Sequence, residues 1–170
     1  MLRLAKAFLD IALWRKTPAH LPASLFLLVL VAAVSALTEV MGALLPPPPN
    51  DEILMRIVLG LGVPLAFTWA LLSLAKRRAR FLQTATALLG VGALAALVLY
   101  PLDSLLGVMG EDKFLWIIGF LWIVVFIWYW LACAHIWRAA FDSGLLLGCF
   151  ISIGYFILSL IIDRQLLPQS

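Results

Sequence analysis

The sequence predicts an all-α polytopic membrane protein: a bundle of five transmembrane helices preceded by an N-terminal interfacial amphipathic helix. Of the 170 residues, 65% are hydrophobic and only 12% are charged, whereas soluble domains lie nearer half and a quarter. The apolar residues form five continuous runs, each close to the roughly 20 residues that cross a bilayer as a helix. Because the runs do not alternate between polar and apolar residues, the pattern argues against a membrane β-barrel.

Residues 1–16 form the first predicted element and differ from the rest of the chain. Arg3, Lys6 and Asp10 share one face of a helix, and apolar residues occupy the others. This pattern favours an amphipathic helix that lies in the membrane interface, with Trp14 and the residues after it at headgroup level. A signal peptide is the competing interpretation. The apolar segment is too long for one, and Glu39 stands where a small-residue cleavage site belongs, so we expect this segment to be retained.

The first two predicted spans cover about 21–45 and 53–75. The first ends at the four prolines 46–49, which cannot continue a helix and favour a stiff extended linker. Asn50, Asp51 and Glu52 follow. They provide a helix cap and acidic residues for the first turn of the second span.

The remaining predicted spans cover about 81–100, 114–137 and 144–162. Tyr100-Pro101 is expected to end the first of these, and the polar residues 110–113 separate it from the next. The fourth span would be about 36 Å long at 1.5 Å per residue. His135, Arg138 and Asp142 are expected to mark the short turn before the last span. Residues 17–170 are therefore predicted to form a single transmembrane domain.

Basic residues are distributed unequally between the two sides of this bundle. With a cytoplasmic N-terminus, nine basic residues lie inside and three lie outside. Short cytoplasmic loops carry an excess of lysine and arginine, so the N-terminus is predicted inside and the C-terminus outside. Short loops and helices rich in alanine and leucine favour a bacterial inner (cytoplasmic) membrane. The outside group is Arg56, Lys113 and Arg164.

Glu39 is the acidic residue that lies well inside a predicted span. A carboxylate in hydrocarbon is costly, so it must face other helices or a water pocket, or be protonated. We favour a structural pair with Arg56, which lies across the proline linker near the same side. The alternative is a proton or cation site.

The cluster Lys76, Arg77, Arg78 and Arg80 separates the second and third spans. It is a candidate contact for anionic lipid, at about 1 kcal/mol per basic residue near the surface. We favour the simpler interpretation that it only sets the topology of the chain.

Histidines, cysteines and aromatic residues give weaker indications. His20 and His135 lack the spacing of a haem or metal site, and a disulfide between Cys133 and Cys149 is not expected in a reducing compartment. Trp116 and Trp137 lie at the two ends of the fourth span, where an aromatic belt is expected at the membrane interfaces. The deeper aromatic residues of the fourth span are interpreted as packing rather than as a cofactor surface. No cofactor or metal is therefore expected.

Small residues recur every four positions on the last span, at Gly144, Gly148 and Ser152. Such a face lets a second helix approach closely. The spacing does not distinguish a contact within the chain from a seam between copies.

No motif of a known catalytic centre occurs in the chain: metalloprotease, nucleophile-elbow and phosphate-loop patterns are missing. We therefore expect a protein without enzymatic activity that acts through helix contacts, as a scaffold, assembly helper or subunit. The alternative is a small transporter or channel component that uses Glu39. Its expected partners are membrane lipids and either a membrane protein or a second copy, and not nucleic acid.

A family resemblance covers about residues 55–165. The segment Arg80-Phe81-Leu82-Gln83-Thr84, then Leu88-Leu89-Gly90 and Tyr100-Pro101, resembles the central part of the Yip1-like membrane proteins. The segment 130–147, with a histidine near the end of the fourth span, is also similar to this family. The resemblance implies five spans with a cytoplasmic N-terminus, and in eukaryotic relatives a role in vesicle traffic through small GTPases. This chain differs from the family pattern in two ways. Its basic cytoplasmic turn lacks the family's glycine pair, and its N-terminal cytoplasmic segment is short.

Overall fold

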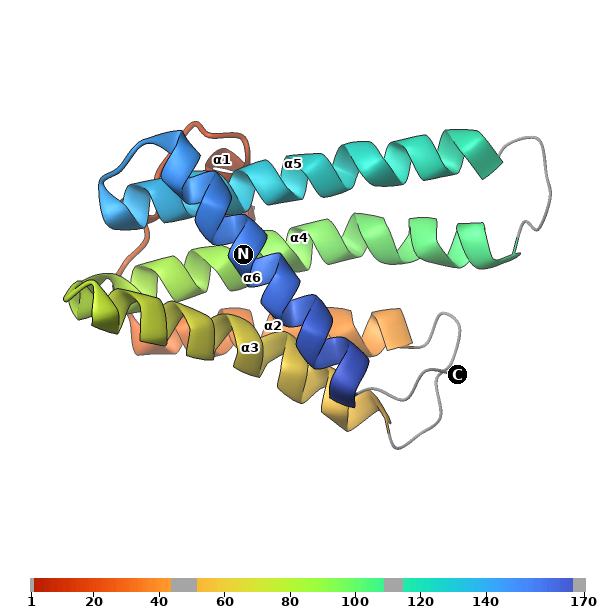
Figure 1. Cartoon of the computed structure of the whole chain (residues 1–170), viewed down its shortest axis with the longest axis horizontal. Helices are drawn as coiled ribbons and strands as arrows, with labels where there is room; N and C mark the ends of the chain where they lie inside the picture. The colour runs from red at the N-terminus through yellow and green to blue at the C-terminus, as the bar shows by residue number, and fades with distance from the viewer. Residues whose placement is uncertain (1, 44–51, 109–114, 167–170) are drawn as a thin grey trace.

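The computed structural model describes residues 2–43, 52–108 and 115–166, and every regular element in these ranges is a helix. Figure 1 shows the arrangement, in which α4 lies between α5 on one side and α2 and α3 on the other. Helix α6 crosses the others obliquely. The elements in chain order are α1 (Leu2–Ala12), η1 (Pro18–His20), α2 (Leu25–Ala43), α3 (Glu52–Leu74), η2 (Arg78–Arg80), α4 (Phe81–Val108), α5 (Leu115–Phe141) and α6 (Leu145–Leu166).

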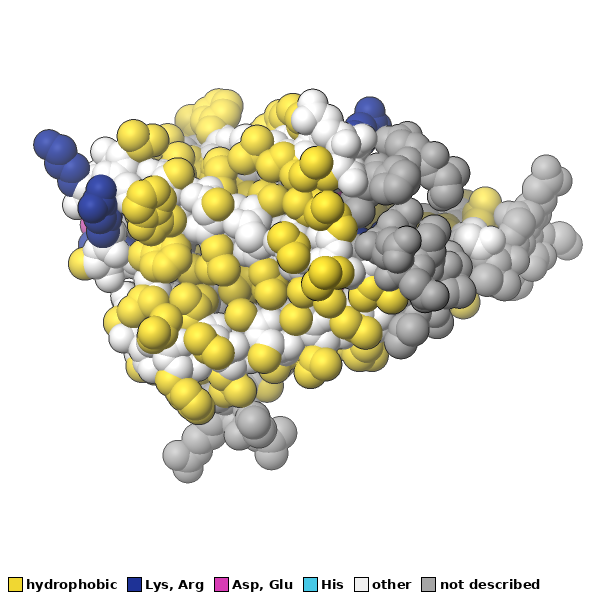
Figure 2. Space-filling view, turned by 90° about the horizontal axis from the view of Figure 1, so that it is seen from below, with side chains coloured by type: hydrophobic (Ala, Val, Ile, Leu, Met, Phe, Trp, Pro, Cys, Tyr) yellow, Lys and Arg dark blue, Asp and Glu magenta, His cyan; other side chains and the backbone are white. Residues whose placement is uncertain are grey.

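Five of these helices, α2 to α6, are long and apolar enough to cross a membrane. Large apolar side chains lie exposed along them, including Phe26 at 77% and Leu74 at 82%. Figure 2 shows one face that is covered by apolar side chains, with basic side chains only near its ends. Such a surface is stable in lipid and not in water. The chain is therefore an integral membrane protein, as the sequence predicts.

Helix α4 forms the centre of the bundle. Half of its spanning segment is buried, against 11% for α6. Its buried residues are mostly small, which allows neighbouring helices to approach closely. The ring of Phe8, for example, occupies the position of a side chain at Gly90. The small buried residues of α4 are Thr84, Ala85, Thr86, Ala87, Gly90, Ala93 and Ala95.

Four helix boundaries differ from the predicted spans. Helix α6 continues past the predicted end at 162 to Leu166. The first span begins at Leu25 rather than near 21, because Ser24 Oγ accepts a hydrogen bond from Leu27 N and caps the helix. Helix α4 continues through Pro101 to Val108. Pro101 has no backbone N–H to donate to the carbonyl one turn before it. The helix nevertheless continues on both sides of this residue. Helix α5 runs to Phe141, so Arg138 lies on the helix and not in the turn.

Helix α1 packs against α4 and α5. Phe8, Ile11 and Ala12 are buried in the same apolar core as the spanning helices, while Leu9 and Leu13 are about half exposed, at 44% and 50%. One part of the apolar surface of α1 thus packs against the spanning helices, and another part is exposed.

Candidate functional site

The two ends of the bundle differ in their charged residues. We call the end with Glu39, Asp103 and Asp163 the acidic end, and the end with η2 and the turn between α5 and α6 the basic end. The acidic end contains the last turns of α2, α4 and α6 and the start of α3. These names are used below.

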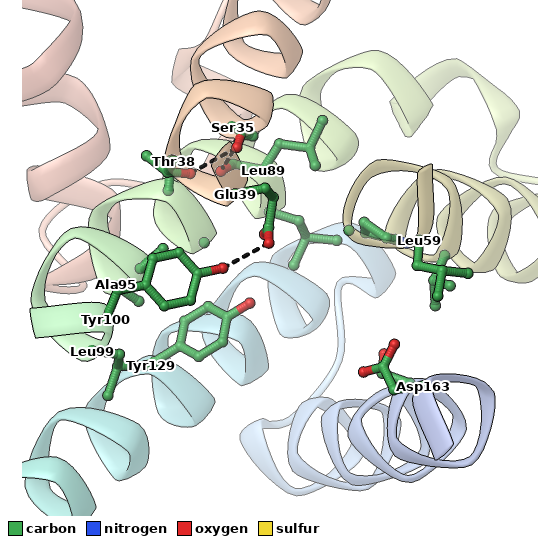
Figure 3. A pocket seen from close by; sticks show the side chains of 18 of the residues that line it. Ser35, Thr38, Glu39, Leu59, Leu89, Ala95, Leu99, Tyr100, Tyr129 and Asp163 are labelled. Atoms are coloured by element: carbon green, nitrogen blue, oxygen red, sulfur yellow. Dashed lines mark hydrogen bonds between the residues drawn. The ribbon is translucent and has the colours of Figure 1, made fainter. Parts of the chain in front are cut away.

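Glu39 lies one turn before the last residue of α2 and contacts α4. The hydroxyl of Tyr100 donates a 2.7 Å hydrogen bond to Glu39 Oε2. Figure 3 shows the two side chains pointing toward each other from their separate helices. This hydrogen bond fixes one carboxylate oxygen and leaves the other available to a further partner.

Arg56, the partner proposed for Glu39 from the sequence, is exposed on α3. It lies close enough to interact electrostatically with both Glu39 and Asp163. The hydrogen bond to Glu39 described above comes from Tyr100. Sequence reasoning missed this residue, because Tyr100 was interpreted only as part of a helix end.

A cavity of about 260 Å³ extends beside Glu39. All five spanning helices contribute to its wall. Glu39, Asp103 and Asp163 provide three carboxyl groups from three different helices, and no lysine or arginine is among the described residues that line it. Three tyrosines line it as well, namely Tyr100, Tyr129 and Tyr155.

Three glycines make room for the polar side chains of this cavity. A Cβ at Gly60 of α3 would lie 3.0 Å from the carboxylate carbon of Glu39, and one at Gly42 would lie 2.5 Å from the ring of Tyr100. At Gly92 the distance to the hydroxyl oxygen of Tyr129 would be 3.4 Å. The polar groups therefore lie against bare backbone, and larger residues at positions 42 and 60 would displace them.

Hydroxyl groups deeper in the cavity wall bond to the backbone. Ser35 Oγ donates to the carbonyl of Leu89 at 3.1 Å, and Thr38 Oγ1 donates to the carbonyl of Ser35 at 2.7 Å. Ser159 differs from them. Its Oγ is buried beside the side chain of Tyr155.

At the basic end, Arg77 and Arg80 converge on Asp142. Arg77 Nη1 and Arg80 Nη2 each lie 2.7 Å from Asp142 Oδ2. Arg80 Nη1 also donates to the carbonyls of Ala139 and Ala140, both at 3.0 Å. The two guanidinium groups hold the pKa of the Asp142 carboxyl below its usual value. The cluster thus ties η2 to the end of α5.

The four basic residues proposed as a lipid contact are divided by the fold. Arg77 and Arg80 bind Asp142, as described, and the guanidinium of Arg78 lies 5.8 Å from the ring centre of Trp69. Lys76 is exposed and ends α3 with a left-handed backbone, at φ 57°. Exposed charge suitable for a lipid headgroup is therefore greatest at Lys76 and Arg78.

The two histidines make different contacts. His135 is buried and its ring stacks on that of Trp14, with centroids 5.5 Å apart; its Nε2 lies 3.0 Å from the carbonyl oxygen of Lys16. His20 contacts Thr17. In the part of the chain that the structure describes, no three histidine, cysteine or acidic residues are placed to hold a metal ion together.

The proposed small-residue face on α6 meets α5. A Cβ at Gly148 would overlap the carbonyl oxygen of Ala134, and Ser152 is fully buried. A Cβ at Gly144 would meet open space. Two of the three positions thus lie in a contact within the chain.

The deep aromatic residues of α5 pack among themselves and against α6. Trp122 stacks on Phe126, with ring centroids 5.3 Å apart, and Tyr129 meets Phe156 edge to face at 5.5 Å. Cys133 is buried and Cys149 is half-buried, and both are free thiols. Trp116 is 71% exposed, whereas Trp137 is fully buried and meets the ring of Phe67 edge to face, so it does not face an interface, contrary to the prediction from the sequence.

Comparison with protein-family models, curated proteins and solved structures gave no match. The function of the chain is therefore inferred from its own residues.

Proposed function

We propose that this integral membrane protein binds a cation in the acidic-end cavity and acts as a small transporter or channel component. The observation that carries the proposal is the Glu39 carboxylate, held by Tyr100 on the wall of a cavity that all five spanning helices share. Ionisable groups inside a membrane are costly, and they usually belong to a substrate or ion pathway. Sites between spanning helices are also where small transporters bind their substrates.

The charge of the cavity wall supports a cation over an anion. Three carboxyl groups and no described basic side chain line it, and Arg56 acts on Glu39 and Asp163 from an exposed position on α3. An anion would be repelled by the wall and would find few donors there.

Ion flux in liposomes tests this proposal. The full chain is reconstituted, and uptake of protons, sodium, potassium and choline is compared between wild type and Glu39→Gln. We expect flux in the wild type and its loss in the variant, with thermal stability in detergent measured in parallel. A folded Glu39→Gln protein that keeps the wild-type flux would contradict the proposal.

The basic residues at the basic end support one orientation of the chain in the membrane. Among the described residues, Arg15, Lys16, Lys76 and the three arginines of residues 77–80 gather there, whereas Arg56 and Arg164 lie toward the acidic end. We therefore place the basic end and the N-terminus in the cytoplasm of a bacterial cell, with the C-terminus and the cavity toward the outside. In this orientation α1 would lie at the cytoplasmic interface.

The second candidate is the role expected first from the sequence, a scaffold, assembly helper or subunit without enzymatic activity. It is favoured by Gly62, Ala66 and Ala70, which recur every four residues on α3 and are all exposed, because such a line suits a partner helix. A Yip1-like membership belongs with this candidate. Mass measurement of the complex extracted in mild detergent tests it, since a lone monomer without partners would contradict it.

A further inference from the structure

We propose that the acidic-end cavity selects a small organic ammonium ion, held by Glu39 and the tyrosine rings, over inorganic cations. This inference rests on the proposed function above and names its ligand class. Three features of the cavity carry it: its size, the arrangement of its carboxyl groups and its aromatic wall. Each is taken in turn.

The cavity is larger than an inorganic ion requires. Its volume of about 260 Å³ lies just below the roughly 300–1,000 Å³ typical of small-molecule pockets. A proton needs no such volume, and a dehydrated metal ion needs ligands that approach within about 2–2.6 Å. The size therefore matches a compact molecule of several heavy atoms.

The carboxyl groups surround the cavity and do not converge on one point. Glu39, Asp103 and Asp163 come from α2, α4 and α6, and the described residues hold no acidic cluster suited to a metal ion. Figure 3 shows Glu39 and Asp163 entering the same space from separate helices. Distributed negative charge suits a cation whose charge is spread over a bulky group.

The aromatic residues provide the remaining wall. Tyr100, Tyr129 and Tyr155 line the cavity together with leucine, alanine and valine side chains. Figure 3 shows the hydroxyl of Tyr129 pointing into it beside that of Tyr100. Aromatic faces attract ammonium groups, and clusters of such rings recognise quaternary ammonium ligands. The apolar side chains suit the substituents of the ammonium nitrogen.

Binding of choline to the purified full chain in detergent tests the proposal. The probes are choline, tetramethylammonium, the uncharged carbon isostere of choline, and sodium and potassium chloride, each measured by calorimetry. We expect saturable binding of the two ammonium ions and none of the isostere. Glu39→Gln should weaken choline binding at least about tenfold, as expected when a charged partner is removed. Binding of the isostere as tight as that of choline would overturn the proposal.

The aromatic contribution has its own matched pair of variants. Tyr129→Phe keeps the ring and should bind choline nearly as well as wild type. Tyr129→Leu should bind about two- to thirty-fold more weakly, the range given by a lost cation–π contact. Equal affinity in both variants would remove the aromatic part of the argument and overturn the selection for ammonium ions. This pair also serves if Glu39→Gln does not fold.

Failure of this inference differs from failure of the proposed function. Glu39-dependent flux of sodium, potassium or protons without ammonium binding would overturn the inference and leave the proposed function intact. If Glu39→Gln changes neither flux nor binding in a folded protein, both fall. Gly60→Ala, which crowds the Glu39 carboxylate, should weaken choline binding, whereas Gly62→Ala on the same helix meets open space and should not.

Discussion

Gly60 of α3 lies directly against the carboxylate of Glu39 on α2. An ideal Cβ at this position would lie 3.0 Å from both Cδ and Oε1 of the glutamate. The absence of a side chain therefore allows an acidic group to lie between two spanning helices that pack against each other. On its other side, the same carboxylate accepts the hydrogen bond from Tyr100. The pocket for Glu39 is thus built jointly by α3 and α4.

This arrangement predicts energetic coupling between Glu39 and Tyr100. Tyr100→Phe keeps the ring and removes only the donor, so we expect it to destabilise the fold by about 1 kcal/mol, the scale of hydrogen bonds between spanning helices. In a double-mutant cycle with Glu39→Leu, which has no acceptor, the two losses should not add, because both remove the same contact. Reversible unfolding in mixed micelles measures this. Strictly additive losses would mean that the hydrogen bond contributes nothing to stability.

The sequence predicts the spanning helices well because the signal is local. A run of some twenty apolar residues is costly in water wherever it occurs, and the structure has five such helices. The residues at which these helices begin and end are harder to predict from the sequence. Pro101 illustrates this, since the bundle holds α4 together across a residue that usually ends a helix.

The candidate site was harder to foresee, because its contacts join distant parts of the chain. Glu39 stands out in the sequence as an acid within an apolar run, yet its partner Tyr100 lies 61 positions away. Gly42 and Gly60 resemble any other glycines of a membrane helix until the neighbouring side chains are in place. Packing of Phe8 and Ile11 was also missed, since the apolar face of an amphipathic helix suits lipid and protein equally.

Gly148 is predicted to be intolerant of large side chains. Gly148→Leu should disrupt folding, because the new side chain would overlap the backbone of α5 at Ala134. Leu146→Phe should be mild, since Leu146 is 72% exposed. Thermal stability and monodispersity in detergent distinguish the two. If Gly144→Leu is as harmful as Gly148→Leu, a contact beyond the chain at Gly144 must be added to the one within it.

Helix α1 is predicted to contribute to the stability of the bundle. Ile11 is 1% exposed, so Ile11→Ala should cost about 2–5 kcal/mol, the range for truncation of a buried isoleucine. Leu13→Ala is the matched control, because Leu13 is 50% exposed. Equilibrium unfolding in detergent compares them. Equal, small losses at both positions would mean that α1 lies on the bundle without stabilising it.

The topology is predicted from the distribution of basic residues. Reporter fusions after Arg80 and Asp142 should report the cytoplasm, and fusions after Asp51, Lys113 and Ser170 should report the outside. Replacing Lys76 and Arg78 by glutamine removes two basic residues without removing the contacts of Asp142, so it should weaken this orientation while the fold is kept. A cytoplasmic C-terminus would contradict the five-span assignment.

The last prediction concerns the pH dependence of the contact between Asp142 and its two arginines. Arg80 and Arg77 lower the pKa of Asp142 in the folded protein, whereas an unfolded aspartate has a pKa of about 3.9. The stabilisation is therefore fully present above this value and is lost as the pH falls through the lower pKa of the folded state. Asp142→Asn should lower thermal stability in detergent at pH 7, and its difference from wild type should shrink steadily as the pH is lowered from about 5 toward 2. Other carboxyl groups titrate in the same window in both proteins, so the difference between the two curves isolates Asp142. Since this carboxylate is 59% exposed, solvent screens the pair and the effect should diminish in high salt. Because asparagine adopts the left-handed backbone of position 142 as readily as aspartate, a difference that stays constant across this pH range would contradict a stabilising role for the charge of Asp142.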